Sequence, residues 1–133
     1  WYDFNGIKCI FTGDLPQAGE KEVIAKHPEI NADILKTGHH GSKTSTSPEF
    51  VRRINPKLAI ISCGRNNRYG HPNQETLKTL NNAGIPYLST ANYGMIKLRK
   101  NFAKMPYLCV YGDGTASRFN LPLRRLLRHN PKG

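Results

Sequence analysis

The sequence predicts an α/β fold, because strand-like and helix-like segments alternate along its 133 residues. Short apolar runs bounded by turn residues, such as Leu58–Ser62, are typical of buried strands. Segments of helix-forming composition, such as residues 18–27, lie between these runs. A hydrophobic content of 38% and a charged content of 22% are those of a globular protein and not of a disordered one. We therefore expect sheets covered by helices on the outside.

The first expected element is a β-hairpin over residues 1–12. Its turn falls at Asn5-Gly6, because both central positions of a type I′ turn need a positive φ. The hairpin's second strand ends at Gly13-Asp14. The helix over 18–27 follows, and Pro28 ends it.

The later elements follow from similar signals. Ser47 is a good N-cap, and Pro48 suits the first position of a helix that runs to about Ile54. Gly84 ends the next helix, in which Leu77 and Leu80 face inward. The remaining expected elements are a strand at 33–37, a loop at 38–45, a strand at 58–62, a loop at 64–72, a helix at 73–83, and strands at 86–90, 93–99 and 107–111.

Positive charge is concentrated in the second half of the chain. The net charge is +11, from 20 Lys and Arg against 9 Asp and Glu. Residues 1–66 contribute +2 of this charge and residues 67–133 contribute +9. Such a field attracts polyanions, because Lys and Arg release the counterions condensed on phosphates. The charge favours a nucleic acid or another phosphate-bearing partner, and the alternative is a merely soluble basic surface.

Two strand ends carry side chains that suit a metal ion. Asp14 follows the strand that ends at Thr12, and the adjacent His39 and His40 follow the strand that ends at Thr37. Imidazole and carboxylate together suit Zn²⁺, Mn²⁺ or Fe. Each signal alone has a simpler explanation, a turn for Gly-Asp and a surface pair for His-His. Their occurrence at two strand ends separated by one helix favours a shared site.

A third polar loop, over residues 66–72, also follows a buried strand. It holds donors that suit phosphate, among them Arg68. His71 either faces the same crevice as the other histidines or is exposed at the start of the next helix. Lys43 and Ser42, in the loop of the histidine pair, are further candidates for binding a substrate.

Three segments together resemble the hydrolase domain of the ComEC family of DNA-uptake competence proteins, which has the metallo-β-lactamase fold. They are Phe11–Asp14, Lys36–Ser45 and Tyr69–Pro72, and the match runs from about residue 7 to residue 98. The resemblance implies an αββα sandwich with two metal ions, of zinc or manganese, at one end of the sheets.

The same resemblance implies roles for individual residues. Asp14 would bridge the two metals, and one of His39 and His40 would complete the shell of one metal. We favour His40 as this ligand and as a catalytic residue with Asp14, because the Gly after it resembles the His-Gly of many relatives. The candidate substrate-binding residues are Lys43, Ser42, Arg68 and His71, and Lys43 with Arg65 or Arg68 could hold the phosphate. The implied reaction is the hydrolysis of a phosphodiester, with DNA, single- or double-stranded, as the expected partner.

The chain departs from the family in one respect. The family's main metal motif, His-x-His-x-Asp-His or His-x-Asp-x-Asp-His, lies upstream of the Thr-Gly-Asp strand and is absent, since histidine occurs only at positions 27, 39, 40, 71 and 129. We therefore expect residues 1–100 to be the C-terminal part of the domain, and residues 101–133 to be a basic extension. We expect the chain alone to bind divalent metal weakly or not at all, to be inactive as a nuclease and to self-associate.

The resemblance also implies a setting. The expected partners are the upstream half of the domain and the membrane channel of a parent protein, with this chain in a soluble, extracytoplasmic domain. One alternative is a free-standing phosphodiesterase of the same fold, acting for example on a cell-wall phosphocholine ester. Another is a non-catalytic module that binds nucleic acid. The segment 119–128 has leucines on one helical face and arginines elsewhere. It is either a DNA or membrane contact, or else a short packing helix or a disordered tail.

Overall fold

The computed structural model describes residues 1–4, 6–100, 106–112 and 115–119 of the chain. The chain divides into two compact units, Trp1–Ala91 and Asn92–Gly133. The first unit holds every residue that the sequence singles out as a candidate for the functional site.

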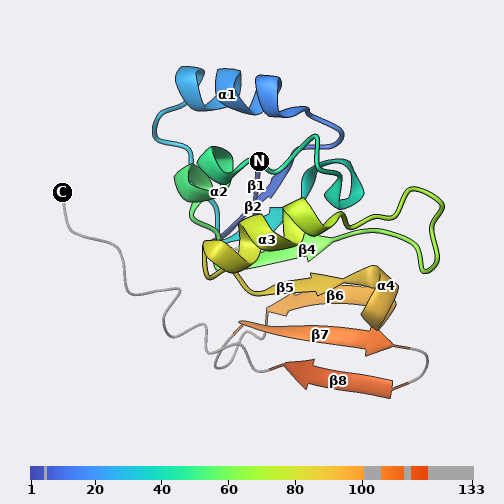
Figure 1. Ribbon diagram of the computed structural model, residues 1–133. Helices are drawn as coiled ribbons and strands as arrows, with labels where there is room; N and C mark the ends of the chain where they lie inside the picture. Colours follow the sequence, from blue (N-terminus) through green and yellow to red (C-terminus); the bar gives the residue numbers. More distant parts are fainter. Residues whose placement is uncertain (5, 101–105, 113–114, 120–133) are drawn as a thin grey trace. The chain divides into compact units, whose positions relative to one another are not determined.

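The first unit is built on a five-stranded sheet in the order β1-β2-β3-β4-β5 (Figure 1). The strand β1 pairs antiparallel with β2, as expected for the hairpin, and the other neighbours are parallel. Gly6 has a φ of 81°, which fits the predicted turn. The strands span Tyr2–Phe4, Ile7–Phe11, Ile34–Lys36, Leu58–Ile61 and Tyr87–Ser89.

Three helices connect the parallel strands. They are α1 (Gln17–Lys26), α2 (Pro48–Ile54) and α3 (Gln74–Asn82). Because parallel strands in chain order are joined by right-handed crossovers, all three helices belong on one face of the sheet. The contacts of α2 with both α1 and α3 agree with this placement. The core between sheet and helices contains Ile10, Ala32, Leu35, Phe50, Val51, Ile54, Ala59, Ile61, Leu80 and Ile85.

Apart from Lys36, the other face of the same sheet is also apolar. Side chains alternate between the faces of a strand, so the strand register assigns each residue to a face. The rows opposite the helices consist of Cys9, Ile34 and Leu58, and of Phe11, Lys36, Ile60 and Leu88. A sheet with two apolar faces needs a second layer against the face without helices. The two-sheet sandwich itself stays a prediction.

The second unit contains an antiparallel sheet of β6 (Met95–Lys100), β7 (Pro106–Gly112) and β8 (Thr115–Phe119). The short helix α4 (Thr90–Tyr93) precedes β6. The sequence did not predict β8, because its TASRF sequence lacks a clear hydrophobic alternation. The arginine- and leucine-rich part of the segment 119–128 lies outside the described residues.

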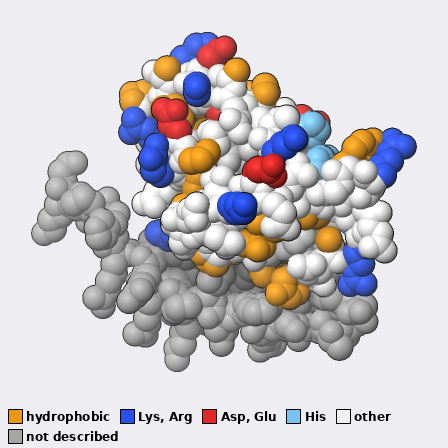
Figure 2. Space-filling view, in the orientation of Figure 1, with side chains coloured by type: hydrophobic (Ala, Val, Ile, Leu, Met, Phe, Trp, Pro, Cys, Tyr) orange, Lys and Arg blue, Asp and Glu red, His pale blue; other side chains and the backbone are white. Residues whose placement is uncertain are grey.

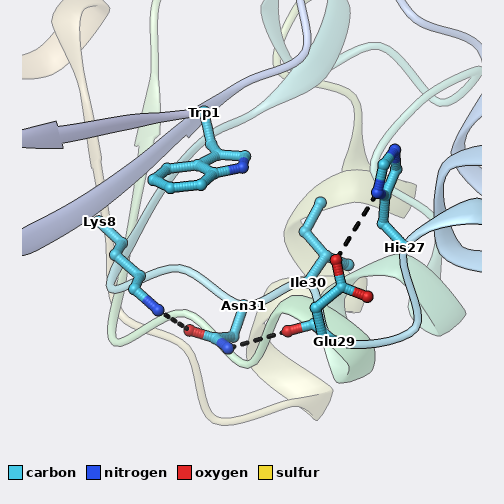
Figure 3. A pocket seen from close by; sticks show the side chains of 6 residues that line it. All are labelled: Trp1, Lys8, His27, Glu29, Ile30 and Asn31. Carbon is cyan, nitrogen blue, oxygen red and sulfur yellow. Dashed lines mark hydrogen bonds and ion pairs between the residues drawn. The ribbon is translucent and has the colours of Figure 1, made fainter.

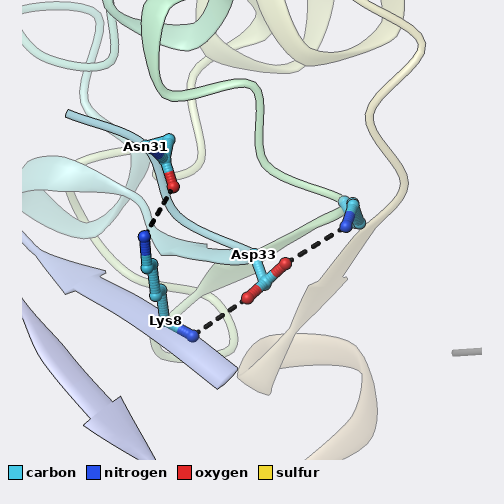
Figure 4. Close-up of polar contacts among 4 residues, drawn as sticks. Lys8, Asn31 and Asp33 are labelled. Carbon is cyan, nitrogen blue, oxygen red and sulfur yellow. Dashed lines mark hydrogen bonds and ion pairs between the residues drawn. The ribbon is translucent and has the colours of Figure 1, made fainter. Parts of the chain in front are cut away.

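Asp33 fixes the amino end of β3 in the sheet (Figure 4). One oxygen of its carboxylate accepts a hydrogen bond from the backbone N–H of Lys8 at 3.0 Å. The other oxygen pairs with the Lys57 ammonium at 3.2 Å. The Lys8 ammonium in turn donates to the Asn31 side chain at 3.2 Å. The strands β2, β3 and β4 are thereby held in register at the edge opposite their carboxyl ends.

Exposed aromatic residues at the β1 end of the sheet lead to a prediction about association. Trp1 and Phe11 are 75% and 63% exposed and line one open pocket of about 300 Å³. Because open edge strands and exposed apolar patches favour pairing, we expect the chain to self-associate. Light scattering should give a mass above the 15.0 kDa of one chain. Phe11→Ser should lower this mass, and Tyr69→Ser should leave it unchanged. A monomeric wild-type chain would contradict the prediction.

Candidate metal centre

Three loops that carry candidate residues leave the same edge of the sheet. Because β2, β3 and β4 are parallel, their carboxyl ends meet there, and ligand sites of α/β proteins form at such edges. Backbone hydrogen bonds join the loops: His39 N–H donates to Gly13 O at 2.8 Å, and Asn73 N–H donates to Gly41 O at 2.9 Å. The three loops therefore contact one another through their backbones, and the convergence of their side chains on one ion stays a prediction.

The two adjacent histidines have an uncommon backbone conformation. They lie in a short 3₁₀ turn, Gly38–Gly41, where a loop was expected. His39 has a φ of 44° and His40 a φ of 58°, both in the left-handed region that side chains other than glycine seldom adopt. Each such residue costs about 1–3 kcal/mol and persists only where the surrounding structure holds it, most often at functional sites. This strain favours a functional explanation of the pair over a plain surface turn.

The imidazoles of His39, His40 and His71, the histidine cluster, lie together. Their ring centroids are 6.2 Å apart for His39 and His40, 5.7 Å for His39 and His71, and 6.4 Å for His40 and His71. Figure 2 shows histidine side chains gathered at the surface of the drawn face. The structure thus places the His71 ring beside those of His39 and His40.

Hydrogen bonds orient two of the three rings. His40 Nδ1 lies 2.8 Å from the carbonyl oxygen of Ser62. A carbonyl only accepts, so Nδ1 carries the proton and a neutral His40 has its lone pair at Nε2. An imidazole held in this way by a backbone carbonyl is the usual arrangement of a metal ligand. His39 Nδ1 is 3.5 Å from the Thr44 hydroxyl, which is a looser contact.

The pKa of His71, the third histidine of the cluster, is lowered. Burial lowers the pKa of His71, and the neighbouring His39 and His40 lower it further. The neutral form of His71 is therefore favoured at neutral pH. A metal ion binds the neutral imidazole, so this shift suits a ligand.

The donor chemistry of the cluster fits a divalent metal, but its ring centroids, 5.7–6.4 Å apart, are farther apart than those of two imidazoles on one ion. With Zn–N bonds of about 2.0–2.1 Å, two imidazoles on one zinc have centroids roughly 5 Å apart. Thr12 Oγ1, at the end of β2, is buried and without a hydrogen-bond partner among the described residues. Within those same residues, however, no group of three or more His, Cys, Asp or Glu side chains has the arrangement of a metal site. The cluster supplies suitable donors without completing a shell.

Asp14 lies in the first of the three loops. It follows Gly13, which has a φ of 58°, and its side chain is exposed. The hydrogen bond from His39 to Gly13 brings the backbone beside Asp14 to the histidine cluster. The approach of the Asp14 carboxylate to an imidazole or to a metal stays a prediction.

The candidate substrate-binding residues divide into buried and exposed groups. Ser42 is buried, and its hydroxyl bonds to Thr44 Oγ1 at 3.0 Å within its own loop. Lys43 and Arg68 are exposed, and Arg68 donates to the Tyr69 hydroxyl at 2.7 Å. Ser42 therefore shapes the loop, whereas the two cations are accessible to an anion.

Three polar residues that sequence reasoning passed over hold these loops. Asn73 Oδ1 accepts from Lys43 N–H at 2.9 Å, and Asn73 Nδ2 donates to Gly70 O at 3.1 Å. The buried Thr76 hydroxyl lies 3.0 Å from Gly41 O. Both are polar residues at the start of α3, where a helix cap is the simpler expectation. Glu20, which is fully buried in α1, binds the loop before α2 through both carboxylate oxygens.

A separate pocket of about 150 Å³ lies away from the histidine cluster (Figure 3). His27 and Glu29 form a 3.6 Å ion pair at its wall, and Asn31 donates to the Glu29 carbonyl oxygen at 3.0 Å. None of the residues of the histidine cluster lines this pocket. Its lining residues are Trp1, Lys8, His27, Glu29, Ile30 and Asn31.

Comparison with known proteins gives the chain its relatives. No family model matches it. It is 50% identical over 99 residues to ComE operon protein 3 of Bacillus subtilis, a match that covers 74% of the chain and 13% of that protein. It is 33% identical over 109 residues to Competence protein ComA of Neisseria gonorrhoeae, covering 80% of the chain and 16% of that protein.

A third relative is Recombination protein 2 of Haemophilus influenzae, which is 34% identical over 89 residues, covering 67% of the chain and 11% of that protein. The chain thus spans between 11% and 16% of the length of these three relatives. Among the described helices, none is long and apolar enough to cross a membrane. Together, the named relatives support a competence-related family for this chain.

Proposed function

We propose that the chain forms part of a metal-dependent phosphodiester hydrolase site, a nuclease site, in a competence protein that takes up DNA. The observation that carries this proposal is the meeting of His39, His40 and His71 at the carboxyl edge of a parallel sheet. The strained backbone of the histidine pair and the fixed orientation of His40 support it further. The apolar second face of the sheet supports a place in the αββα sandwich of the metallo-β-lactamase fold.

The proposal assigns a role to each candidate residue. His40 and His39, with Asp14 from the neighbouring loop, would hold zinc or manganese. When bound, such a metal makes a coordinated water nucleophilic and stabilises the charge that develops on a phosphodiester. The exposed Lys43 and Arg68 would attract the phosphate. The remaining ligands would come from an upstream half of the domain, and the parent would be a membrane protein with this domain in an extracytoplasmic position.

Metal titration tests the proposal on the chain itself. We expect weak binding of Zn²⁺ or Mn²⁺ by calorimetry, and His40→Ala should weaken it at least about tenfold, since even changes to residues around a ligand have such effects. The control is His27→Ala, which removes an exposed histidine from another part of the unit. Equal affinities of the wild type and His40→Ala would contradict the assignment.

Hydrolysis of bis(p-nitrophenyl) phosphate, which has no nucleobase, gives a second measurement. We expect no turnover by the chain alone, because a catalytic zinc needs three protein ligands with an open position, and the described residues do not complete this set. Robust metal-dependent turnover by the chain would overturn the view that the site is incomplete. In an active parent protein, Asp14→Ala should abolish turnover, and DNA binding should persist if the charge of the second half provides it.

A further inference from the structure

The loop between β4 and α3 presents an aromatic ring to solvent next to the histidine cluster. Tyr69 is 63% exposed, so a ligand can reach most of its side chain. It lies two residues before His71. Neither the metal site nor the phosphate contacts proposed above use this ring.

Planar groups form a column that leads from solvent to the cluster. The rings of Tyr69 and His71 are stacked, with centroids 5.8 Å apart and an angle of 26° between their planes. The His71 and His40 rings are also stacked, at 15° and 6.4 Å. The Arg68 guanidinium carbon lies 4.9 Å from the centre of the Tyr69 ring. Figure 2 shows the exposed part of this face, on which arginine or lysine, apolar and histidine side chains lie near one another.

The loop that carries the column is held by its own hydrogen bonds. The Asn67 side chain donates to Gly64 O at 2.9 Å and to His71 O at 2.6 Å, and it accepts from His71 N–H at 2.9 Å. Asn73 adds a bond to Gly70 O. The loop backbone that carries Tyr69 is therefore held before any ligand arrives, which reduces the entropy lost on binding.

The charge around the ring suits a polyanion. Arg65 and Arg68 are exposed within the same loop, and no Asp or Glu occurs between Ser62 and Gln74. An exposed ring beside exposed cations is the combination by which proteins bind single-stranded nucleic acid, with bases stacked on the ring and phosphates near the cations.

We propose that Tyr69 is a stacking platform for an unpaired nucleobase, next to the phosphate that faces the histidine cluster. The proposal rests on the proposed function, because it names the substrate of that site as single-stranded nucleic acid. A base stacks on the ring through its π-face, which every base has, so the platform is tolerant of sequence. A base in a duplex is already stacked on its neighbours and is not available to the ring.

The test measures binding of two fluorescent strands by anisotropy, in EDTA, with the whole 133-residue chain. One strand is a twelve-nucleotide oligothymidine, and the other is an abasic strand with the same phosphates. Tyr69→Ala should weaken oligothymidine binding about tenfold, within a range of roughly fivefold to a hundredfold. It should leave abasic binding and the salt dependence unchanged, because tyrosine carries no charge. Tyr69→Phe, which keeps the ring, should bind like the wild type.

Tyr2→Ala is the matched control, because Tyr2 is 62% exposed and lies on β1. It should change neither affinity. Equal weakening for both strands, or no weakening for oligothymidine, would overturn the stacking role, as would a wild-type chain that binds neither strand. The metal titration and the base-free phosphodiester do not depend on a nucleobase, so failure of the platform is distinguished from failure of the hydrolase proposal.

Discussion

Glu20→Ala should destabilise the first unit by about 3–5 kcal/mol, because it leaves two buried backbone N–H groups without an acceptor, each at a cost of about 1–3 kcal/mol, and removes charge-assisted bonds. Glu20 is fully buried, and its two oxygens accept from Thr46 N–H at 2.5 Å and from Ser47 N–H at 2.8 Å. Thr46 has a φ of 59°, so the carboxylate also holds a backbone that would otherwise relax. Urea unfolding followed by circular dichroism measures the change, since α1, α2 and α3 all belong to this unit.

Glu22→Ala is the control on the same helix. Glu22 is 71% exposed and pairs with Lys26, at 3.7 Å and one turn away. Such pairs contribute about 0.3–0.5 kcal/mol, so this change should be nearly silent. Glu20→Gln should have an intermediate effect, because the amide retains one acceptor oxygen and places an NH₂ group against the other donor. If Glu20→Ala and Glu22→Ala unfolded at the same urea concentration, the carboxylate would not be the anchor of this loop.

Gly41→Ala should destabilise the unit by about 2–5 kcal/mol. Gly41 has a φ of 83°, a conformation that costs an L-residue about 1–2 kcal/mol. An added Cβ would lie 2.8 Å from Pro72 Cβ and 3.1 Å from Ile61 Cγ2, and overpacking of this kind costs about 1–3 kcal/mol more. Relief of the contact would push the β3–α2 loop away from the β4–α3 loop. We therefore also expect weaker metal binding, since these loops carry the histidine cluster.

Gly70→Ala separates the two contributions. Gly70 has a φ of 65°, yet nothing lies within 4 Å of the added Cβ. Gly70→Ala should therefore lower the free energy of unfolding only by the conformational cost, about 1–2 kcal/mol. Comparison of the two urea midpoints then isolates the contact with Pro72 and Ile61. If Gly41→Ala and Gly70→Ala lost the same free energy of unfolding, close packing between the loops would contribute little to stability.

The element order could be predicted from local signals, and most expected elements are present. Ser47 caps α2 as expected, with its hydroxyl accepting from Phe50 N–H at 3.2 Å, and the predicted helix at 18–27 is α1. The strand β8 was missed because a polar, mixed pentapeptide gives no periodic signal. The division after residue 100 stays a prediction. It follows from the extent of a resemblance, whereas the two compact units meet between Ala91 and Asn92.

Less of the candidate site could be predicted from sequence. The histidine pair was recognisable because it directly follows a strand, and parallel strands bring such loops together. The place of His71 depends on how the β4–α3 loop folds, and Asn67 and Asn73 decide this through side-chain bonds to distant backbone. The role of Glu20 could not be predicted, because a glutamate in a helix is ordinarily exposed. It depends on the packing of α1 against α2, which brings the backbone N–H groups of Thr46 and Ser47 to the carboxylate.

The order of the sheet also bears on how the unit folds during synthesis. Each parallel strand pairs with the one made just before it, with partners at positions 9 and 34, 34 and 58, and 59 and 87. Pairings of this moderate sequence separation let a nascent chain add one strand and one helix at a time, without waiting for a distant segment. The histidine cluster cannot assemble before the loop between β4 and α3, which carries His71, has emerged from the ribosome.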